Sequence, residues 1–361
     1  MKFLIGLVTA MAIVVVLLAR PAQPVQPSQQ VPITTLNPQT QQQAQSVLDQ
    51  AMQETHAKGG LAMVMSTKGG EIQALAATDP NMAARPWQPG SVVKPLLMAA
   101  ALNERAITTD AHYYDSGSVT ISGFTINNVL RGSGERSMQD VLNYSLNTGA
   151  IYILKQLGGG QINARARQTW YDYLTQHYLF NQPTHTGLVG ERPGFVRQPT
   201  LSRGSTLAYA SSSFGVDVTV SPIQLSADYA ALVNGGTYYS PRINSSQPVY
   251  QKSAVISTET SAVITKMLEQ VAVFKDVKPR SNFMIGAKSG TAPLADDQSN
   301  YKPEFDSGTF VGFIGKGHPE QIIMVRLDEP QTSATEVAST LTGVYWTKLA
   351  NQMMDTINAT D

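Results

Sequence analysis

A serine and a lysine three residues apart stand where a helix is expected to begin. Gly90 permits a tight entry, Ser91 follows, and Pro95, which has no N–H, is tolerated only in a first helical turn. Lys94 therefore falls on the same face as Ser91. A hydroxyl is a weak nucleophile, but a lysine whose pKa is lowered by burial and a second cation can take its proton. The pair predicts a serine nucleophile with a lysine base, although a capped helix start with a solvated lysine has the same spacing.

Two later segments carry side chains that suit the same chemistry. The Ser-Leu-Asn sequence of Ser145–Asn147 interrupts a helical pattern with residues that prefer local hydrogen bonds, which predicts a corner between helices. The Lys-Ser-Gly-Thr sequence of Lys288–Thr291 continues a short apolar run typical of a strand. Its lysine would be the second cation, its hydroxyls would bind a carboxylate, and its glycine would let a substrate peptide pair along the edge. Each segment alone also suits an ordinary helix corner or strand end.

Other kinds of site find less support. The five histidines lie outside any recognisable nucleophile motif, and no Gly-x-Ser-x-Gly turn is present. No His-Glu-x-x-His or paired-cysteine pattern offers a metal site, and the absence of cysteine excludes a disulfide framework and a cysteine nucleophile. We therefore expect neither a metal nor another cofactor.

The composition is that of a globular domain and argues against nucleic-acid binding. Of the 361 residues 42% are apolar, which is enough for a sizeable core, and only 14% are charged. The formal net charge is zero and no block of Lys and Arg occurs. Without a basic patch, nucleic acid is not an expected partner.

The N-terminus predicts the compartment. The run Phe3–Ala19 has no charged residue, and at about 1.5 Å per residue it nearly spans a bilayer core of about 30 Å. It is longer than the apolar part of most signal peptides, and the residues around Arg20 make a poor cleavage site. We expect an uncleaved single-pass anchor over residues 1–20, a Pro- and Gln-rich linker over 21–43, and the domain over 44–361 on the extracytoplasmic side of the cell membrane. A cleaved signal peptide would instead give a secreted enzyme.

The elements expected in the domain place strands at both ends of it and helices between. Strands are expected at 61–66, 71–76, 283–287, 309–314 and 321–327. Helices are expected at about 44–57, 92–104, 138–156, 163–178, 222–234, 259–273 and 334–354. Segregated strands favour an α+β fold: a five-stranded antiparallel sheet with the last helix packed on it, and a mainly helical lobe. The motifs come from distant segments, so we expect the active site between sheet and lobe.

Together and in this order, the motifs resemble those of the class B penicillin-binding proteins, the monofunctional D,D-transpeptidases of peptidoglycan synthesis. The resemblance covers roughly residues 59–354 and includes, besides the motifs, the segments 88–95, 188–194, 213–225 and 234–241. It implies the fold of the β-lactamase and transpeptidase superfamily. Two departures stand out. Ser289 occupies a position where threonine is common, and about 40 residues separate the expected anchor from the first strand, where the family usually has a large pedestal module.

The resemblance also implies a mechanism. Ser91 would attack the D-Ala-D-Ala stem peptide, Lys94 would act as base, and Ser145 would pass a proton to the leaving D-Ala. The backbone N–H groups of Ser91 and Thr291 would form the oxyanion hole. The remaining motif residues would orient groups, supply field or bind the substrate carboxylate: Asn147, Lys288, Ser289, Gly290 and Thr291. The acyl group would then pass to an amine of a neighbouring stem, and penicillin would acylate the same serine.

The partners implied are peptidoglycan stem peptides, β-lactams, the membrane and a membrane glycan polymerase. Three alternatives remain: a D,D-carboxypeptidase, which uses water as acceptor; a β-lactamase, although no added Glu motif for deacylation is evident; and a non-catalytic β-lactam sensor or cell-wall scaffold. Penicillin distinguishes most of them, because a lactamase turns it over, a transpeptidase traps it and a scaffold ignores it.

Overall fold

The computed structural model describes residues 34–129, 132–200, 203–295, 301–332 and 337–360, and these belong to one folded unit. The expected anchor Phe3–Ala19 lies outside the described residues, as does the larger part of the expected linker. None of the helices in the described part of the chain combines the length and apolar character needed to cross a bilayer.

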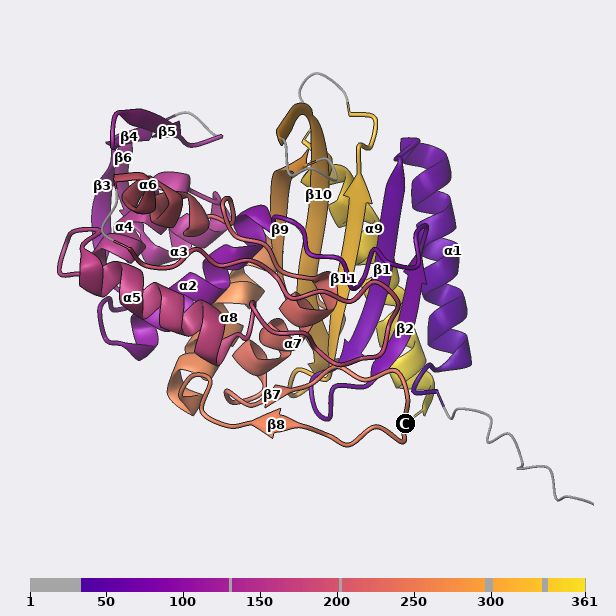
Figure 1. Cartoon of the computed structure of the whole chain (residues 1–361). Helices are drawn as coiled ribbons and strands as arrows, with labels where there is room; N and C mark the ends of the chain where they lie inside the picture. The colour runs from indigo at the N-terminus through magenta and orange to yellow at the C-terminus, as the bar shows by residue number, and fades with distance from the viewer. Residues whose placement is uncertain (1–33, 130–131, 201–202, 296–300, 333–336, 361) are drawn as a thin grey trace, which may run out of the picture. The chain divides into compact units, whose positions relative to one another are not determined.

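A five-stranded antiparallel sheet joins the two ends of the folded unit, with the strand order β2-β1-β11-β10-β9 (Figure 1). The strands are β1 (Gly59–Ser66), β2 (Ile72–Ala77), β9 (Phe283–Ala295), β10 (Tyr301–Lys316) and β11 (Gln321–Asp328). The first strand pairs with the last, so that Met63 lies opposite Met324. The predicted sheet is confirmed, and β9, which carries the Lys-Ser-Gly-Thr motif, is an edge strand.

One face of the sheet is covered by α1 (Pro38–Thr55) and α9 (Ala338–Thr360) (Figure 1). The Trp346 indole N–H of α9 donates to Ile323 O of β11 over 2.8 Å, which confirms the predicted packing of the last helix on the sheet. The predicted start of the first helix at residue 44 is wrong. The helix begins at Pro38, because the Asn37 side chain caps the N–H of Thr40 over 3.0 Å and proline suits a first turn. Residues 38–43 therefore belong to the helix and not to a linker.

The other face is covered by a mainly helical lobe. Its helices are α2 (Lys94–Asn103), α3 (Met138–Asn143), α4 (Asn147–Leu157), α5 (Ala164–Asp172), α6 (Arg203–Ser212), α7 (Pro222–Val233) and α8 (Thr258–Phe274). Every residue of α2 from Lys94 to Ala101 is buried, so this helix is the centre of the lobe. All of these helices except α6 were predicted from the sequence, although α4 ends one residue beyond its expected range and α8 exceeds its range by one residue at each end.

Alternation along β1 separates two cores. Met63 and Met65 contribute to the core shared with the helical lobe, whereas Ala62 and Val64 contribute to the core beneath α1 and α9. Successive side chains of a strand point to opposite faces, so a strand covered on both sides is apolar throughout.

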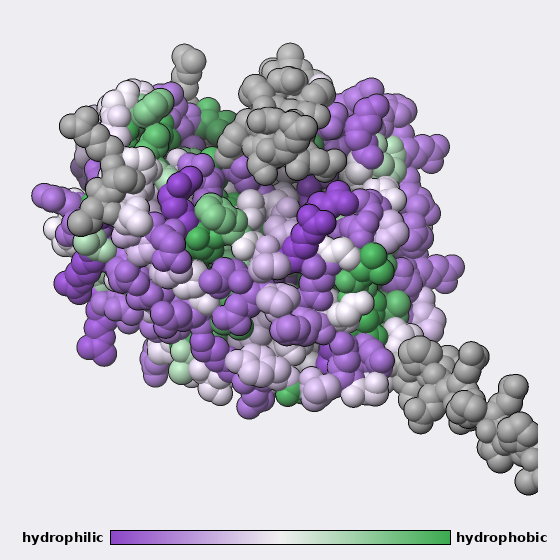
Figure 2. Space-filling view, in the orientation of Figure 1, coloured by the Kyte–Doolittle hydropathy of each residue, from purple (hydrophilic) through white to green (hydrophobic). Residues whose placement is uncertain are grey.

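The surface of the unit differs from these cores. The side seen in Figure 2 is mostly hydrophilic, with apolar residues in small separate patches.

Several short strands were not predicted from the sequence. They form three two-stranded pairs: β3 (His112–Asp115) with β6 (Gly134–Ser137), β4 (Ser118–Ile121) with β5 (Phe124–Asn127), and β7 (Tyr238–Tyr239) with β8 (Gln251–Lys252). Strands of two to four residues are too short to show a period, and their partners are set by the rest of the fold.

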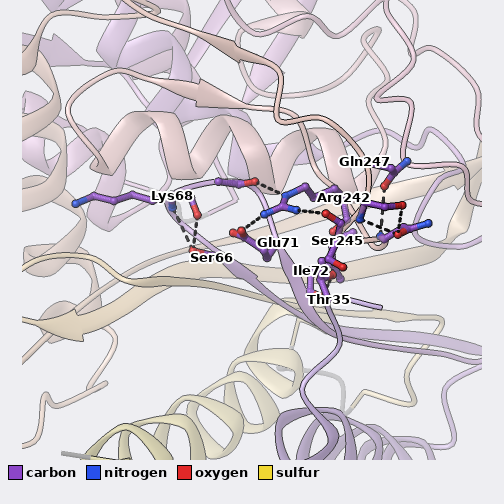
Figure 3. A network of polar contacts seen from close by, with 11 residues as sticks. Thr35, Ser66, Lys68, Glu71, Ile72, Arg242, Ser245 and Gln247 are labelled. Carbon is purple, nitrogen blue, oxygen red and sulfur yellow. Dashed lines mark hydrogen bonds and ion pairs between the residues drawn. The ribbon is translucent and has the colours of Figure 1, made fainter. Parts of the chain in front are cut away.

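The described chain begins in a set of polar contacts that we call the basal network, formed by Thr35, Gly69, Glu71, Ile72 and Arg242 (Figure 3). The Thr35 hydroxyl donates to Ile72 O over 2.7 Å and to Arg242 O over 3.1 Å. The Arg242 guanidinium pairs with the Glu71 carboxylate and donates to Gly69 O over 3.0 Å. The network thus ties the start of the described chain to the β1–β2 turn.

Candidate active site

Ser91 lies in a 3-10 turn, Gly90–Val93, that leads directly into α2. The turn fits against β9 because Gly90 has a φ of +58° and no side chain, and a Cβ there would lie 2.7 Å from Thr291 O. Gly215 closes the other side: its carbonyl accepts from the Gly90 N–H over 3.0 Å, and its own Cβ would lie 2.0 Å from Gly90 O. Both glycines are therefore needed to seat the serine between a strand and the loop after α6.

Gly290 has a different neighbour from the one expected. A Cβ at this position would lie 3.0 Å from the backbone N of Val92 and 3.2 Å from Pro89 O. The missing side chain thus makes room for the turn that carries Ser91, and the sequence-based explanation, that it makes room for a substrate peptide, is not needed to account for this glycine.

Lys94 lies at the centre of the site and contacts three of its other residues. Its side chain is 1% exposed. Its Nζ lies 2.9 Å from Ser91 Oγ, 2.9 Å from Asn147 Oδ1, 3.3 Å from Ser145 Oγ and 2.5 Å from Ser145 O. Burial, followed by the nearby charge of Lys288, holds the pKa of Lys94 well below its ordinary value of 10.5. A neutral amine at this place can accept the proton of Ser91.

Lys288 is the second buried cation, with no exposed surface. Its Nζ donates to Ser145 Oγ over 2.9 Å and to Ser289 O over 2.7 Å. Burial, with a smaller effect of the Lys275 charge at the end of α8, lowers the pKa of Lys288 to about 7. The Ser145 hydroxyl therefore bridges two amines that both bind protons weakly.

Ser145 is held in an unusual backbone conformation. Its φ is +58°, in the left-handed region, directly after the end of α3. The N–H of Leu146 donates to Val141 O over 3.0 Å, which is the long bond of a Schellman helix end, and glycine is the usual residue at the left-handed position. A serine there is strained, and such strain is typical of functional positions.

Asn147 is fixed at both ends of its amide. Its Oδ1 faces Lys94, and its Nδ2 donates to Asn127 O over 3.0 Å. Asn127 is the last residue of β5, one of the strands that sequence analysis did not predict. No local pattern linked it to a helix start twenty residues later.

The last two motif residues lie beside this group. Ser289 is buried, and the half-buried Thr291 uses its hydroxyl to donate to Ser339 Oγ on α9 over 3.0 Å. Ser307 Oγ contacts Ala292 O over 3.4 Å, so the Ala292 carbonyl faces β10. Peptide groups alternate along a strand, which directs the N–H and C=O of Thr291 to the free edge beside Gly90.

The structure thus brings the three motifs into one hydrogen-bonded group. Ser91, Lys94, Ser145, Asn147 and Lys288 are joined by contacts of 3.3 Å or less, and Ser289–Thr291 border them. Among the described residues, no three His, Cys, Asp or Glu side chains group into a metal site.

Two tyrosines that sequence reasoning did not single out bind backbone carbonyls close to the nucleophile. The Tyr229 hydroxyl donates to Val92 O over 2.7 Å, and the Tyr178 hydroxyl donates to Leu96 O over 2.9 Å. Both side chains are fully buried. They bind one carbonyl of the turn that bears Ser91 and one in the first turn of α2, which bears Lys94, and so hold both segments in place.

Known proteins resemble this chain in sequence and in fold. Stage V sporulation protein D of Bacillus subtilis is 29% identical over 319 residues, covering 79% of this chain and 47% of that protein. The probable peptidoglycan D,D-transpeptidase PbpC of Pseudomonas aeruginosa is 27% identical over 307 residues, covering 80% and 52%. The apo transpeptidase domain of Burkholderia pseudomallei penicillin-binding protein 3 superposes with a TM-score of 0.77 at 24% identity, covering 92% of this chain and 98% of that one, which shows the same fold.

The chain spans about half the length of these curated relatives. The family model described as the penicillin binding protein transpeptidase domain matches residues 60–353, which include the sheet, the helical lobe and all three motifs. On this match, the chain belongs to the family of penicillin-binding protein transpeptidase domains.

Proposed function

We propose that this chain is a peptidoglycan D,D-transpeptidase that forms an acyl-enzyme on Ser91 from D-Ala-D-Ala stem peptides and cross-links them. One observation carries the proposal: the Ser91 hydroxyl lies 2.9 Å from a buried lysine whose pKa is held low. A nucleophile beside a neutral base is what acyl transfer requires. The name of the Pseudomonas relative, a probable peptidoglycan D,D-transpeptidase, supports the same reaction.

In the acylation step, Ser91 Oγ attacks the carbonyl of the penultimate D-Ala while Lys94 Nζ takes the hydroxyl proton. The backbone N–H groups of Ser91 and Thr291 stabilise the oxyanion, because the Thr291 peptide faces the free edge of β9 beside the serine. The substrate backbone pairs along that edge, which has no strand neighbour among the described residues. Its terminal carboxylate meets the hydroxyls of Ser289 and Thr291, and the Thr291 hydroxyl exchanges Ser339 for the substrate.

Collapse of the tetrahedral intermediate breaks the peptide bond and releases D-Ala. The leaving amine needs a proton, and Ser145 Oγ, between Lys94 and Lys288, can pass one from Lys94. Asn147 keeps Lys94 in place, and Lys288 supplies positive field near the substrate carboxylate. In the second step the amine of a neighbouring stem attacks the carbonyl of the Ser91 ester, and its proton passes to the same relay. The ester C–O bond then breaks, Ser91 Oγ takes a proton back from Lys94, and the new amide bond is the cross-link.

We also propose the cellular setting that the sequence predicts. Residues 1–20 anchor the chain in the cell membrane, a tether follows, and the domain acts on the extracytoplasmic side. Since α1 begins at Pro38, the tether ends before that helix. A membrane glycan polymerase is the proposed partner, because cross-linking acts on glycan strands that such an enzyme makes. Recovery of the full chain with membranes after a high-salt wash, and a mature N-terminus upstream of residue 20, test the anchor.

Covalent labelling tests the reaction. Fluorescent penicillin should label the full-length chain, and peptide mass spectrometry should place the adduct on Ser91. The label should persist for many minutes, because the opened penicillin cannot leave as D-Ala does and blocks the acceptor. Ser91→Ala should abolish labelling without unfolding, since removal of a hydroxyl at a helix start costs only about 1 kcal/mol.

The same assay separates the alternatives. An adduct on any residue other than Ser91 contradicts the mechanism. Release of hydrolysed penicillin within seconds identifies a β-lactamase. A stem-peptide donor supplied with and without an amine acceptor then separates a transpeptidase, which forms cross-linked product, from a carboxypeptidase, which releases D-Ala and forms none.

A further inference from the structure

The orientation of the Asn147 amide decides whether it can serve Lys94. Its Oδ1 lies 2.9 Å from Lys94 Nζ, where it accepts a hydrogen bond. A flipped amide would instead turn its NH₂ group toward the lysine amine. That group would either face the N–H donors of the amine or occupy the lone pair that must accept the Ser91 proton. What holds the amide the right way round is the Asn127 carbonyl, which accepts from Asn147 Nδ2 over 3.0 Å.

The next residue after Asn127 belongs to a buried cluster of Asp115, Asn128 and Thr148, which we call the Asp115 cluster. Asp115 is 1% exposed, and Asn128 and Thr148 are each 7% exposed. Asp115 Oδ2 accepts from Asn128 Nδ2 over 2.8 Å, and Asp115 Oδ1 accepts from the Thr148 hydroxyl over 2.8 Å. The Gly117 N–H also donates to Oδ1 over 2.8 Å. Every described contact uses this carboxylate as an acceptor.

The cluster also supplies the cap that α4 lacks. The helix begins at Asn147, and its N-cap residue Leu146 has no side chain able to bind the first N–H groups. Asn128 Oδ1 accepts from the Thr148 N–H over 3.1 Å instead, from a separate part of the chain. The Asp115 carboxylate, bound to the Thr148 hydroxyl, adds an acidic group near the positive end of the helix. The start of α4, which bears Asn147, is thus fixed from outside the helix.

The composition of the cluster argues for more than packing. Among the described ion pairs none includes Asp115, so the acid is buried without a cation partner at ion-pair distance. Such a group is held only by its hydrogen bonds, and apolar residues would serve stability as well or better. The advantage of a polar cluster is directional, since each bond specifies where one atom lies.

We propose that Asp115 is a positioning residue for acylation: through Asn128 and Thr148 it locks the end of β5 to the start of α4, so that the Asn127 carbonyl holds Asn147 with its oxygen on Lys94. The proposal rests on the function proposed above and deepens it. Asp115 touches neither Ser91 nor either active-site lysine, and on the route through Asn127 three hydrogen bonds separate it from Lys94.

A reciprocal exchange tests the direction of these bonds. Asp115→Asn keeps the shape of the side chain but sets its NH₂ group against the NH₂ of Asn128, or, if flipped, against the donors of Gly117 and Thr148. Adding Asn128→Asp restores complementarity: the new amide at 115 donates to the new acid at 128, and the acid still accepts the Thr148 N–H. We expect Asp115→Asn to slow acylation of Ser91 by fluorescent penicillin about 10- to 100-fold, the loss typical of a displaced reacting group. The exchanged pair should recover most of that rate.

Two further measurements separate positioning from general loosening. The affinity of the initial, non-covalent penicillin complex should change little, so the loss should lie in the acylation rate constant. In a background that already carries Asn147→Ala, Asp115→Asn should have almost no further effect, because residues that act through one another are not additive. Asp110→Asn, at an exposed position shortly before β3, is the matched control for loss of one acidic charge and should acylate at the wild-type rate.

The outcomes are distinct. A folded Asp115→Asn chain that acylates at the wild-type rate overturns the proposal, as does full additivity with Asn147→Ala. If Asp115→Asn does not fold, the proposal is tested with the exchanged pair and with Thr148→Ala, which removes one hydroxyl from the cluster. Wild-type acylation by Thr148→Ala contradicts the proposal, and so does slow acylation by a folded exchanged pair. Failure of the wild-type chain to be labelled at Ser91 would instead contradict the proposed function, and every comparison above is made after that labelling is established.

Discussion

The active-site group and the basal network are both dense polar clusters beside the same sheet, and they differ in whether their charges are paired. In the basal network the Arg242 guanidinium meets the Glu71 carboxylate, so opposite charges are paired. In the active site Lys94 and Lys288 share the Ser145 hydroxyl, and every described contact of the two amines is to a neutral oxygen. Two groups that can carry the same charge are thus brought together without an acid among their described contacts.

The two clusters also differ in place and burial. Through the strand register, Thr291 is level with Gly60 at one end of β1, whereas Glu71 follows Ser66, which ends that strand. The side chains of the basal ion pair are 13% and 31% exposed, whereas the two lysines are at most 1% exposed. An ion pair near solvent costs little free energy of folding, and it holds together the segments that carry its two side chains. Two buried, unpaired amines destabilise the fold, and the same burial lowers the pKa values of both, that of Lys288 to about 7.

Replacement of Lys94 should give the largest change in the acylation rate, without a loss of stability. Lys94→Met keeps a long apolar side chain but removes the base, so acylation of Ser91 should fall by about 10²- to 10⁴-fold. The melting temperature should stay the same or rise, because burial of an amine no longer opposes folding. Stopped-flow acylation and thermal unfolding of the same preparation check the two effects. A variant that unfolds at a lower temperature would show that the amine contributes to stability as the basal charges do.

Replacement of Lys288 should move the pH dependence. The Lys288 charge helps to keep the pKa of Lys94 low, so Lys288→Met should raise that pKa and move the rise of the acylation rate to higher pH. If the pKa of Lys94 rises by about one, the neutral fraction of the amine, and with it the rate, falls about tenfold at pH values well below that pKa. The rate measured from pH 5 to 10 shows how far the profile moves, and an unchanged profile would show that the two amines do not interact.

The direction in which the stability of the same variant should change with pH also follows from the pKa of Lys288. The folded pKa of Lys288, about 7, lies below the ordinary 10.5, so the folded chain binds fewer protons than the unfolded chain between these values. This residue therefore makes wild-type stability rise with pH across that window. Lys288→Met should gain most over wild type at pH 7 or below and lose that gain toward pH 10, as urea unfolding at several pH values would show.

The basal ion pair should give the smallest effect, and only on stability. Glu71→Gln leaves the mostly buried Arg242 without its charged partner and should cost about 1–3 kcal/mol in urea unfolding. Asp276→Asn, in a pair whose side chains are 82% and 86% exposed, is the control and should cost less than about 0.5 kcal/mol. Acylation should equal wild type in both. A tenfold slower Glu71→Gln enzyme would show that the two clusters are coupled.

Much of the sheet was predictable because its strands carry their own signals. The apolar runs of β1, β9, β10 and β11 are long enough to be recognised, and segregation of strands to the two ends of the domain indicated one antiparallel sheet. The start of α1 was misplaced because glutamine-rich sequence resembles a linker, although Asn37 and Pro38 are ordinary helix-start residues. The strands β3–β8 were missed because two to four residues cannot show a period.

By itself the sequence was enough to predict the kind of chemistry. A lysine one helical turn from a serine, a polar helix corner and a strand lysine are local patterns, and residue types and spacing are enough to find them. Only the tertiary structure decided that Ser145 lies between two amines and that their pKa values fall, because burial and charge proximity are sums over segments far apart in the chain. The tertiary structure likewise revealed the Asp115 cluster, whose members have ordinary sequence neighbours and meet only when β3, β5 and α4 are packed together.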